Sequence, residues 1–546
     1  MSTRSGLWLA IGLTVGLTAV SCSCRTLLPF DETRYTAVAW EMRVRGDYLV
    51  PHLNGETYSH KPPLLFWLIN AGWSVAGVTE HVPRLISPLA GLICLLLTWK
   101  LARRLWPDDQ QTAGYAAVML STCLLWMVLS NFVMFDVLLA VFVLIGIHGV
   151  WLTADRPVSS LGLIALAVGG GVLTKGPVIL LHLLPTALTL PWWFPVRERR
   201  QRLIHAGVVG GGCLAGLLSA GCWAIPAAWV GGDEYRQQIL WGQTAGRMVN
   251  SFAHALPWWW YLPLIPAMFF PWSLLISLLR DWKPSIREDR GVRLCTVWYL
   301  STVAAFSAMS GKQVHYLLPA FPAVALLFSR LVRIQPQLRF TTDRRLVGLA
   351  LVGTAVAFAF PDLFGNVRFQ DVTPRAQWSF VATLGGMAAA IVLFRFRSQQ
   401  QELLGFAAVV AAGFVVFYGG PLRDLQSRDE TKLLAAELAQ AEAANIPVAY
   451  FGEYHGQFHF AGRLTKPLAV LRGAAELGAW SHQHPEGLVV RSQPADSPAE
   501  ITPVAAHLMS CLGRNLRVEL VPSTDLQMWS ADLPPQTAEG PREQHY

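Results

Sequence analysis

The chain has 546 residues, of which 53% are hydrophobic and only 14% are charged. Domains that dissolve in water carry about 25% charged residues, so this composition excludes an ordinary soluble domain and favours a protein with lipid as its solvent. The formal net charge of +8 falls in short basic clusters between apolar runs, a pattern that indicates membrane topology and argues against nucleic-acid binding.

The first apolar run, residues 7–20, follows Arg4 and predicts an uncleaved signal anchor. Cys22 and Cys24 come directly after it, but the preceding Ala-Val-Ser is a poor lipoprotein cleavage sequence. Six of the eight cysteines lie in or beside apolar segments, where we expect them to pack as small hydrophobic side chains.

A membrane-spanning helix needs about 20 mostly apolar residues, and we predict about thirteen such spans along the chain. The expected spans lie near residues 7–20, 85–102, 113–130, 137–153, 159–174, 177–194, 204–228, 259–279, 292–309, 316–333, 346–360, 379–395 and 403–419. Gly169–Gly171, inside one of these spans, predict close packing of two helices.

Alternate connections between the spans are basic, which places the N-terminus in the cytoplasm. The basic connections contain Arg103 and Arg104; Arg156; Arg197, Arg199, Arg200 and Arg202; Arg280, Lys283, Arg287 and Arg290; Arg333, Arg339, Arg344 and Arg345; and Arg395 and Arg397. The connections predicted to lie outside the cytoplasm are residues 24–62, 131–136, 175–176, 229–258, 310–315 and 361–378.

The composition changes after about Tyr418. Residues 430–443 read as an amphipathic helix, and residues 448–451 and 487–490 as short strands. We therefore predict a polytopic α-helical membrane domain over residues 1–419, followed by a small extracytoplasmic α/β domain over residues 420–546 whose tail is disordered.

The first outside connection, residues 24–62, carries the densest set of chemically useful side chains. Asp31 stands just beyond the first span, where a carboxylate could take a proton from an acceptor hydroxyl. Arg34 and Lys61 could neutralise a phosphate at the level of the headgroups. Charges that merely anchor a helix in the interface would give a similar pattern.

The order of short motifs in this connection resembles the family of bacterial lipid-A aminoarabinose transferases and the related protein O-mannosyltransferases, which are GT-C membrane glycosyltransferases. The motifs are DETRY at 31–35, RGDY at 45–48, VPHLNG at 50–55 and HKPPL at 60–64. The resemblance continues through Asp136, TKGP at 174–177, residues 247–261 and residues 310–319, so it covers roughly residues 1–335. The C-terminal third resembles the family only in its layout.

The resemblance implies roles for individual residues. Asp31 and Asp136 match the two acidic residues of the catalytic cavity, with Asp31 as the base that activates the acceptor. Arg34, Lys61 and Arg247 match residues that contact the donor phosphate. Further residues expected to line the substrate cavity are Glu32, Tyr35, Lys312, His315 and Tyr316.

In the aminoarabinose transferases a metal bridges an acidic residue and a histidine, and the matching positions here are His60 and His254. His60 departs from the acidic pattern. Two imidazoles could still bind Zn²⁺ or another divalent cation with a water or phosphate oxygen, and no other cofactor is expected. Lys175 fits either a side chain that snorkels to the interface or one that lines the cavity.

Together these features predict an inverting glycosyltransferase of the bacterial inner membrane. It would move a hexosyl or pentosyl group from a polyprenyl-phosphate carrier to lipid A, another glycolipid or a protein on the periplasmic side. The sequence leaves the sugar and the acceptor open. The main alternative is a transporter or flippase of lipid-linked sugars, although such proteins keep their charges within the spans. An oligosaccharide polymerase or ligase and a lipid-phosphate sensor are further alternatives.

Overall fold

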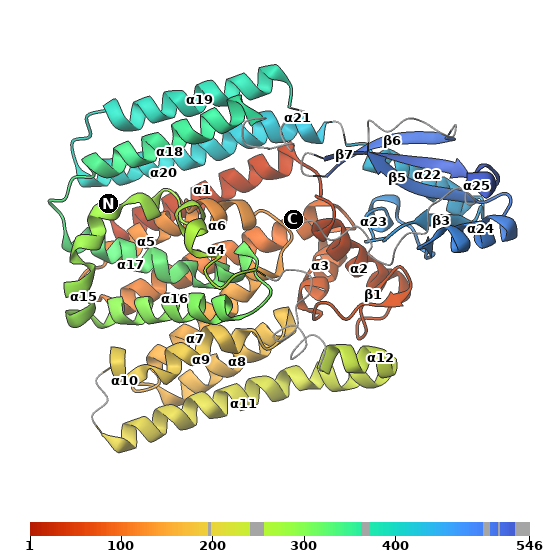
Figure 1. The fold of residues 1–546 in the computed structure, drawn as a ribbon. Helices are drawn as coiled ribbons and strands as arrows, with labels where there is room; N and C mark the ends of the chain where they lie inside the picture. Colours follow the sequence, from red (N-terminus) through yellow and green to blue (C-terminus); the bar gives the residue numbers. More distant parts are fainter. Residues whose placement is uncertain are drawn as a thin grey trace.

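The computed structural model describes residues 1–194, 198–240, 256–361, 372–427, 429–494, 503–511 and 514–529. A large helical bundle makes up most of the molecule, and a mixed β-sheet with its own helices packs at one end of it (Figure 1). The main hydrophobic core runs through the bundle, whereas two smaller cores lie on the sheet.

Eight of the described helical segments are long and apolar enough to cross a membrane. They are α1 (Thr3–Cys24), α4 (His81–Leu105), α7 (Phe135–Leu152), α8 (Pro157–Lys175), α11 (Arg199–Val230), η5 with α17 (Val314–Ile334), α19 (Pro374–Leu393), and α20 with its continuation (Gln399–Gln426). The chain therefore has the polytopic helical architecture expected from its composition.

Three of the other expected spans are divided into shorter helices. Two more, near residues 292–309 and 346–360, form the continuous helices α16 (Arg290–Ala308) and α18 (Thr341–Ala359), so the total of thirteen stays a prediction. Residues 113–130 form α5 (Gln111–Ser121) and α6 (Leu124–Leu129), and residues 177–194 form α9 (Ile179–Leu188) and α10 (Leu190–Trp193). Residues 259–279 are divided among η2 (Leu262–Leu264), α14 (Ile265–Met268), η3 (Trp272–Leu274) and the start of η4 (Ile276–Asp281). Pro263, Pro266 and Pro271 explain this last division, because proline cannot continue the backbone ladder of a helix. Further helices described in this part of the chain are α12 (Gly232–Gln237) and α15 (Trp282–Glu288).

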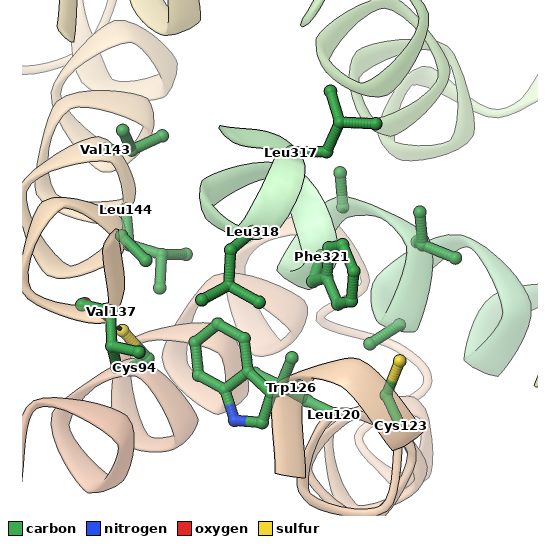
Figure 2. Close-up of a cluster of buried hydrophobic side chains, with 14 of the residues drawn as sticks. Cys94, Leu120, Cys123, Trp126, Val137, Val143, Leu144, Leu317, Leu318 and Phe321 are labelled. Atoms are coloured by element: carbon green, nitrogen blue, oxygen red, sulfur yellow. Dashed lines mark hydrogen bonds between the residues drawn. The ribbon is translucent and has the colours of Figure 1, made fainter. Parts of the chain in front are cut away.

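The helices of the bundle pack through apolar and small residues. Figure 2 shows a buried cluster in which Cys94, Trp126, Val137, Leu318 and Phe321 come from different helices. Helices α8 and α11 approach closely where a Cβ added at Gly216 would lie 2.7 Å from the carbonyl oxygen of Ala165. A Cβ at Gly169 would lie 3.3 Å from the carbonyl oxygen of Gly216, which confirms the predicted close packing.

The connection predicted over residues 24–62 contains a helix that the sequence analysis missed, α2 (Asp31–Arg45). Its first turn is acidic, its last turn is basic, and Gly46 ends it with a φ of 69°, all of which favour a helix. A hairpin of β1 (His52–Leu53) and β2 (Glu56–Thr57) follows, with Asn54 and Gly55 at positive φ in its two-residue turn. Pro63 then caps α3 (Leu64–Ala76).

The C-terminal part begins with α21 (Arg423–Gln426) and α22 (Thr431–Ala443) and then forms a five-stranded sheet of order β4-β3-β5-β7-β6. Strands β3 (Val448–Phe451), β4 (Ala469–Leu471) and β5 (Leu488–Pro494) are parallel, whereas β6 (Ala505–Cys511) and β7 (Arg514–Pro522) add antiparallel pairs. Helices α23 (His459–Gly462), α24 (Ala474–Gln483) and α25 (Ser523–Trp529) complete it. The expected helix near residues 430–443 and the two expected strands are present.

This C-terminal unit packs directly on α2 and its hairpin. The indole of Trp40 donates a hydrogen bond of 2.9 Å to the carbonyl oxygen of Leu464. The side chain of Asn54 exchanges two hydrogen bonds with the backbone of Leu468. Helix α2 is therefore held between the bundle and the C-terminal unit, where Figure 1 places it.

Candidate functional site

Two residues on the first turn of α2 form the exposed part of the candidate site. Asp31 accepts a hydrogen bond from the guanidinium of Arg34, one helical turn later. The side chain of Asp31 is 54% exposed and that of Arg34 is 22% exposed. A carboxylate is thus accessible at the end of the bundle, with a cation at its side.

A buried ion pair forms the inner part of the site. Asp136, on the first turn of α7, lies 2.5 Å from Nζ of Lys175, on the last turn of α8. Nε2 of His315 lies 3.9 Å from the other oxygen of Asp136, and Nζ of Lys175 lies 4.5 Å from the centroid of the Tyr316 ring. Residues from α7, α8 and η5 (Val314–Ala320) therefore meet around one carboxylate.

Lys61 links the outer and inner parts. Its Nζ lies 5.8 Å from the centroid of Phe135, and the edge of Tyr35 packs on the same ring with centroids 4.9 Å apart. Lys61 also lies close enough to Asp136 to interact with it electrostatically. Aromatic rings thus hold an ammonium group between α2 and the start of α7.

The electrostatics of α2 favour an anionic ligand. Burial works against the charged form of Arg34, but Tyr58, Tyr35 and Asp31 raise the pKa of its guanidinium above the ordinary value. Burial, followed by the charge of Asp31, raises the pKa of Tyr35 far above its usual range, so its phenol keeps its proton. Among the described residues, no partner accepts a hydrogen bond from the buried Nε of Arg34.

The predicted site residues have three different outcomes in the structure. One group comes together at this end of the bundle: Asp31, Arg34, Tyr35, Lys61, Asp136, His315 and Tyr316. Arg247 and His254 lie outside the described residues. The remaining predicted residues are Lys312 and Glu32, which bond within the fold, and His60, whose ring packs on Tyr58.

The side chain of Lys312 forms hydrogen bonds with the backbone. Its Nζ donates hydrogen bonds to the carbonyl oxygens of Leu256 and Met309. Burial lowers the pKa of its ammonium group. These bonds fix the turn before η5, and the expectation that Lys312 lines the substrate cavity stays a prediction.

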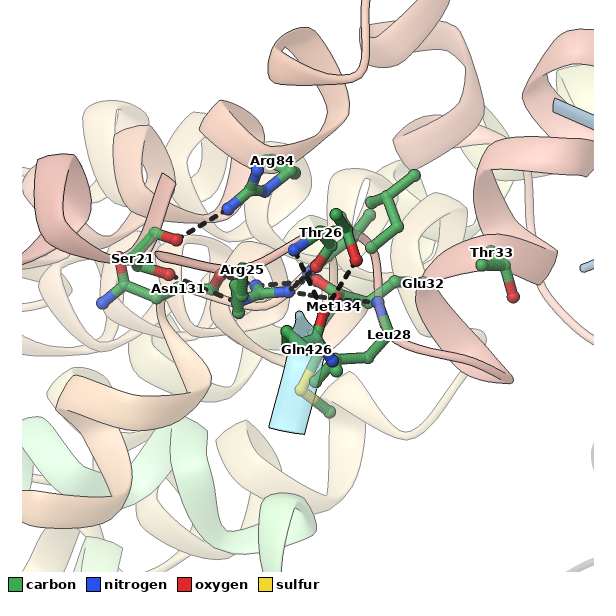
Figure 3. A network of polar contacts seen from close by, with 12 residues as sticks. Ser21, Arg25, Thr26, Leu28, Glu32, Thr33, Arg84, Asn131, Met134 and Gln426 are labelled. Atoms are coloured by element: carbon green, nitrogen blue, oxygen red, sulfur yellow. Dashed lines mark hydrogen bonds and ion pairs between the residues drawn. The ribbon is translucent and has the colours of Figure 1, made fainter. Parts of the chain in front are cut away.

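Glu32 is part of a buried network (Figure 3), and its expected place at the substrate cavity stays a prediction. Its carboxylate pairs with Arg25 and accepts hydrogen bonds from the backbone N–H groups of Leu28, at 2.8 Å, and Val133, at 2.7 Å. Arg25 also donates to the carbonyl oxygen of Asn131. Glu32 therefore ties the start of α2 to the segment that leads into Asp136.

Sequence reasoning missed Arg25 and left Lys175 undecided. Arg25 follows the first span directly, where a basic residue suits a simple interface anchor. Lys175 lies 39 residues from its partner Asp136, so no local spacing could have paired them. A lysine at the end of one apolar span and a carboxylate at the start of another form the signal that would have suggested such a pair.

The described residues do not supply a metal site. Within the segments that the structure describes, no group of three His, Cys, Asp or Glu side chains is arranged to bind a metal ion. His60 packs against Tyr58, with ring centroids 5.2 Å apart. Its expected partner His254 is not described, so the two-imidazole site stays a prediction and no chemical step is derived from it.

Comparisons with known proteins agree on one kind of relative. The family profile described as dolichyl-phosphate-mannose-protein mannosyltransferase matches residues 60–223. An undecaprenyl phosphate-alpha-4-amino-4-deoxy-L-arabinose arabinosyl transferase of Pseudomonas aeruginosa is 32% identical over 372 residues, which is 66% of each chain. A protein of the same name, numbered 1, from Pseudomonas fluorescens is 32% identical over 318 residues, 55% of this chain and 53% of the relative. The match thus spans about half to two thirds of these relatives.

The solved structures extend the likeness to nearly the whole chain. ArnT from Cupriavidus metallidurans, crystallised with undecaprenyl phosphate, superimposes with a TM-score of 0.72 at 19% identity. The superposition covers 93% of this chain and 97% of ArnT. The apo form of ArnT gives a TM-score of 0.70. At this identity the likeness concerns the fold, which is that of a polytopic GT-C membrane protein.

Proposed function

We infer that this chain, which belongs to the family of GT-C membrane glycosyltransferases that contains the bacterial aminoarabinose transferases, transfers a sugar from a polyprenyl-phosphate carrier to an envelope acceptor. The observation that carries this proposal is the meeting of Asp31, Arg34 and Lys61 with the buried pair of Asp136 and Lys175. Among the residues that the structure describes, three cations and two carboxylates meet there, and a phosphate at this place would interact with all three cations.

The cations would act on the leaving group. When the bond between the anomeric carbon and the phosphate oxygen breaks, negative charge develops on the phosphate, and fixed cations stabilise that charge. Arg34 has a buried Nε without a described acceptor, and a guanidinium binds phosphate oxygens in a bidentate manner. We assign the donor phosphate to Arg34 and Lys61, with Arg247 as a further candidate from the sequence.

Asp31 would serve as the base. Its exposed carboxylate can be reached by an acceptor hydroxyl, whose proton it would take as the oxygen attacks the anomeric carbon from the face opposite the phosphate. Arg34 pairs with Asp31 in the structure. Binding of the donor phosphate would draw Arg34 away and leave the carboxylate free to accept the proton.

Asp136 would act from inside the site. Because its carboxylate is buried and bonded to Lys175, with His315 beside it, it fixes the ammonium group rather than meeting bulk water. A single displacement inverts the anomeric centre, and no covalent intermediate with the enzyme is required. We assign Tyr35 and Tyr316 to the walls of the sugar-binding cavity.

We place the site on the periplasmic side of the bacterial inner membrane, with the N-terminus cytoplasmic, thirteen spans within residues 1–419, and residues 420–546 as a periplasmic α/β domain. Support comes from the alternating basic connections and from the packing of the C-terminal unit on α2. The names of the relatives make 4-amino-4-deoxy-L-arabinose the first donor sugar to test. The resemblance to the lipid-A aminoarabinose transferases makes lipid A the first acceptor.

Mass spectrometry of lipid A and other envelope glycolipids tests this proposal. Four strains are compared: the wild type, a deletion, and the deletion complemented with Asp31→Asn or with Asp155→Asn. Asp155 is an exposed carboxylate in the turn between α7 and α8, so it serves as the matched control. We expect one sugar mass to disappear in the deletion, to stay absent with Asp31→Asn, and to return with Asp155→Asn.

Other outcomes would contradict the proposal in distinct ways. Return of the sugar mass with Asp31→Asn would remove Asp31 as the base. An unchanged set of glycolipids and glycoproteins in the deletion, together with accumulation of polyprenyl-linked sugar on the cytoplasmic side, would favour a flippase instead.

A further inference from the structure

A second charged site lies at the end of the bundle opposite the candidate active site. Lys100, Arg103 and Arg104, together with Gln110, line a hollow of about 370 Å³. All three cations lie near the C-terminal end of α4, whose N-terminal end at Glu80 and His81 is on the side of α2. At 1.5 Å per residue, the 25 residues of α4 separate the two ends by about 37 Å.

The guanidinium of Arg104 is held in place by a buried histidine. Nη1 of Arg104 lies 2.7 Å from Nδ1 of His148, and Nε2 of His148 lies 3.0 Å from the carbonyl oxygen of Leu97. A carbonyl only accepts and a guanidinium only donates, so His148 is neutral, with its proton on Nε2. His148 is therefore a fixed acceptor that orients Arg104 without neutralising its charge.

Arg103 is oriented in the same way by another neutral group. Its Nε donates a hydrogen bond of 2.6 Å to the amide oxygen of Gln110, whose nitrogen donates to the carbonyl oxygen of Pro107. The guanidinium also lies 4.6 Å from the centroid of the Trp99 ring. Each arginine thus has one edge fixed by a neutral partner and keeps further N–H groups for a ligand.

In the part of the chain that the structure describes, Lys100, Arg103 and Arg104 form no ion pair with an acid. Asp109, which is close in sequence, pairs with Arg330 and Arg333 instead. Three like charges around one hollow repel each other, and the partial negative charge at the end of α4 offsets only about half of one unit. An anion in the hollow would relieve this repulsion.

We propose that this hollow binds the phosphate of an anionic phospholipid from the leaflet on that side of the membrane. Because α4 is long enough to span the bilayer, its last turn lies at the level of the headgroups, and basic pockets between helices at that level suit cardiolipin-type lipids. A positive charge that only sets topology needs no buried acceptor to orient it, whereas Arg104 has one in His148. The proposal is independent of the transferase function.

Lipid binding to the purified full-length protein tests the proposal directly. Native mass spectrometry would measure the affinity for cardiolipin and for phosphatidylcholine, in the wild type, Arg103→Gln/Arg104→Gln and Arg200→Gln. Arg200 is exposed at the start of α11 and does not line the hollow. We expect the double variant to bind cardiolipin about 30-fold more weakly, from the contribution of two basic residues to anionic lipid binding, and Arg200→Gln to match the wild type.

Two further measurements keep the result unambiguous. Lys100→Gln, at an exposed position, should weaken cardiolipin binding several-fold even if the double variant fails to fold. Inorganic pyrophosphate serves as the soluble probe. Displacement of cardiolipin by pyrophosphate at millimolar concentration would overturn the lipid as the ligand and point to a soluble phosphate compound. Equal loss of phosphatidylcholine, or an unchanged affinity in all variants, would overturn the site itself.

Discussion

The buried pair of Arg25 and Glu32 allows a sharp prediction about stability. Both side chains are almost fully buried, at 0% and 4% exposure. The variant Glu32→Ala removes the only described carboxylate that pairs with Arg25, and it also leaves the N–H groups of Leu28 and Val133 without their acceptor. The folded state would then contain an uncompensated cation and two unsatisfied donors.

The expected cost follows from these lost interactions. Breaking a buried ion pair by removing one partner costs about 3–5 kcal/mol, and each buried donor left unsatisfied costs about 1–3 kcal/mol. The paired variant Arg25→Met/Glu32→Ala removes the charge as well, so what remains is the lost acceptor and the lost donors to the carbonyl oxygens of Thr26 and Asn131. We therefore expect the paired variant to be more stable than Glu32→Ala alone by about 3 kcal/mol.

Thermal unfolding in detergent, followed by size-exclusion chromatography, measures this difference for the wild type, both single variants and the pair. We expect Glu32→Ala to lower the midpoint by about 3–10 °C and Arg25→Met to restore part of that loss. The network in Figure 3 does not contribute as argued if Glu32→Ala unfolds at the same temperature as the wild type, or if the paired variant loses as much stability as the two single variants added together.

Three other substitutions or conditions test separate parts of the molecule. Lys61→Met should lower kcat about 100-fold, as expected for the loss of one group that stabilises developing charge. The exposed control Lys466→Met should leave kcat unchanged, and equal effects of the two variants would exclude Lys61 from the site. Gly216→Val should destabilise the protein, because its side chain would meet the carbonyl of Ala165, whereas Gly210→Ala, with open space around it, should not. Burial lowers the pKa of His459 to about 4, so the unfolded state binds the proton of this histidine more tightly than the folded state does. The free energy of unfolding of the C-terminal unit should therefore fall by about 3 kcal/mol as the pH falls from 6.5 to 4. Circular dichroism measured against pH would follow this loss, and His459→Gln should reduce the pH dependence.

Features that depend on local pattern were predictable from the sequence. The alternation of apolar runs and basic connections predicted a polytopic helical protein, and the Gly169–Gly171 stretch predicted close helix contact, which the structure confirms. Helix α2 was missed although its acidic start, basic end and Gly46 carried a helix signal. The polar character of that segment outweighed the signal, because a connection between spans was expected to be irregular.

Features that depend on tertiary contacts could not be predicted from the sequence. Asp31, Arg34 and Lys61 were identified as candidates because they share one short segment. Their meeting with Asp136 depends on the contact of α2 with the start of α7 and on the ion pair between α7 and α8. Glu32 stands next to Asp31 in sequence and has an entirely different environment. Adjacent residues on a helix point in different directions, so one of two neighbouring carboxylates can face a site while the other is buried.

The packing of the C-terminal unit on α2 also sets an order of events during synthesis. Trp40 and its partner Leu464 are 424 residues apart, and a ribosome that adds about 5–20 residues per second needs about 20–85 s to cover that distance. During this interval the helix that carries Asp31 is already made but lacks its outer cover. A nascent chain would therefore reach the site geometry described here only when its last domain has emerged, so prematurely terminated products would be inactive even if all their spans had inserted.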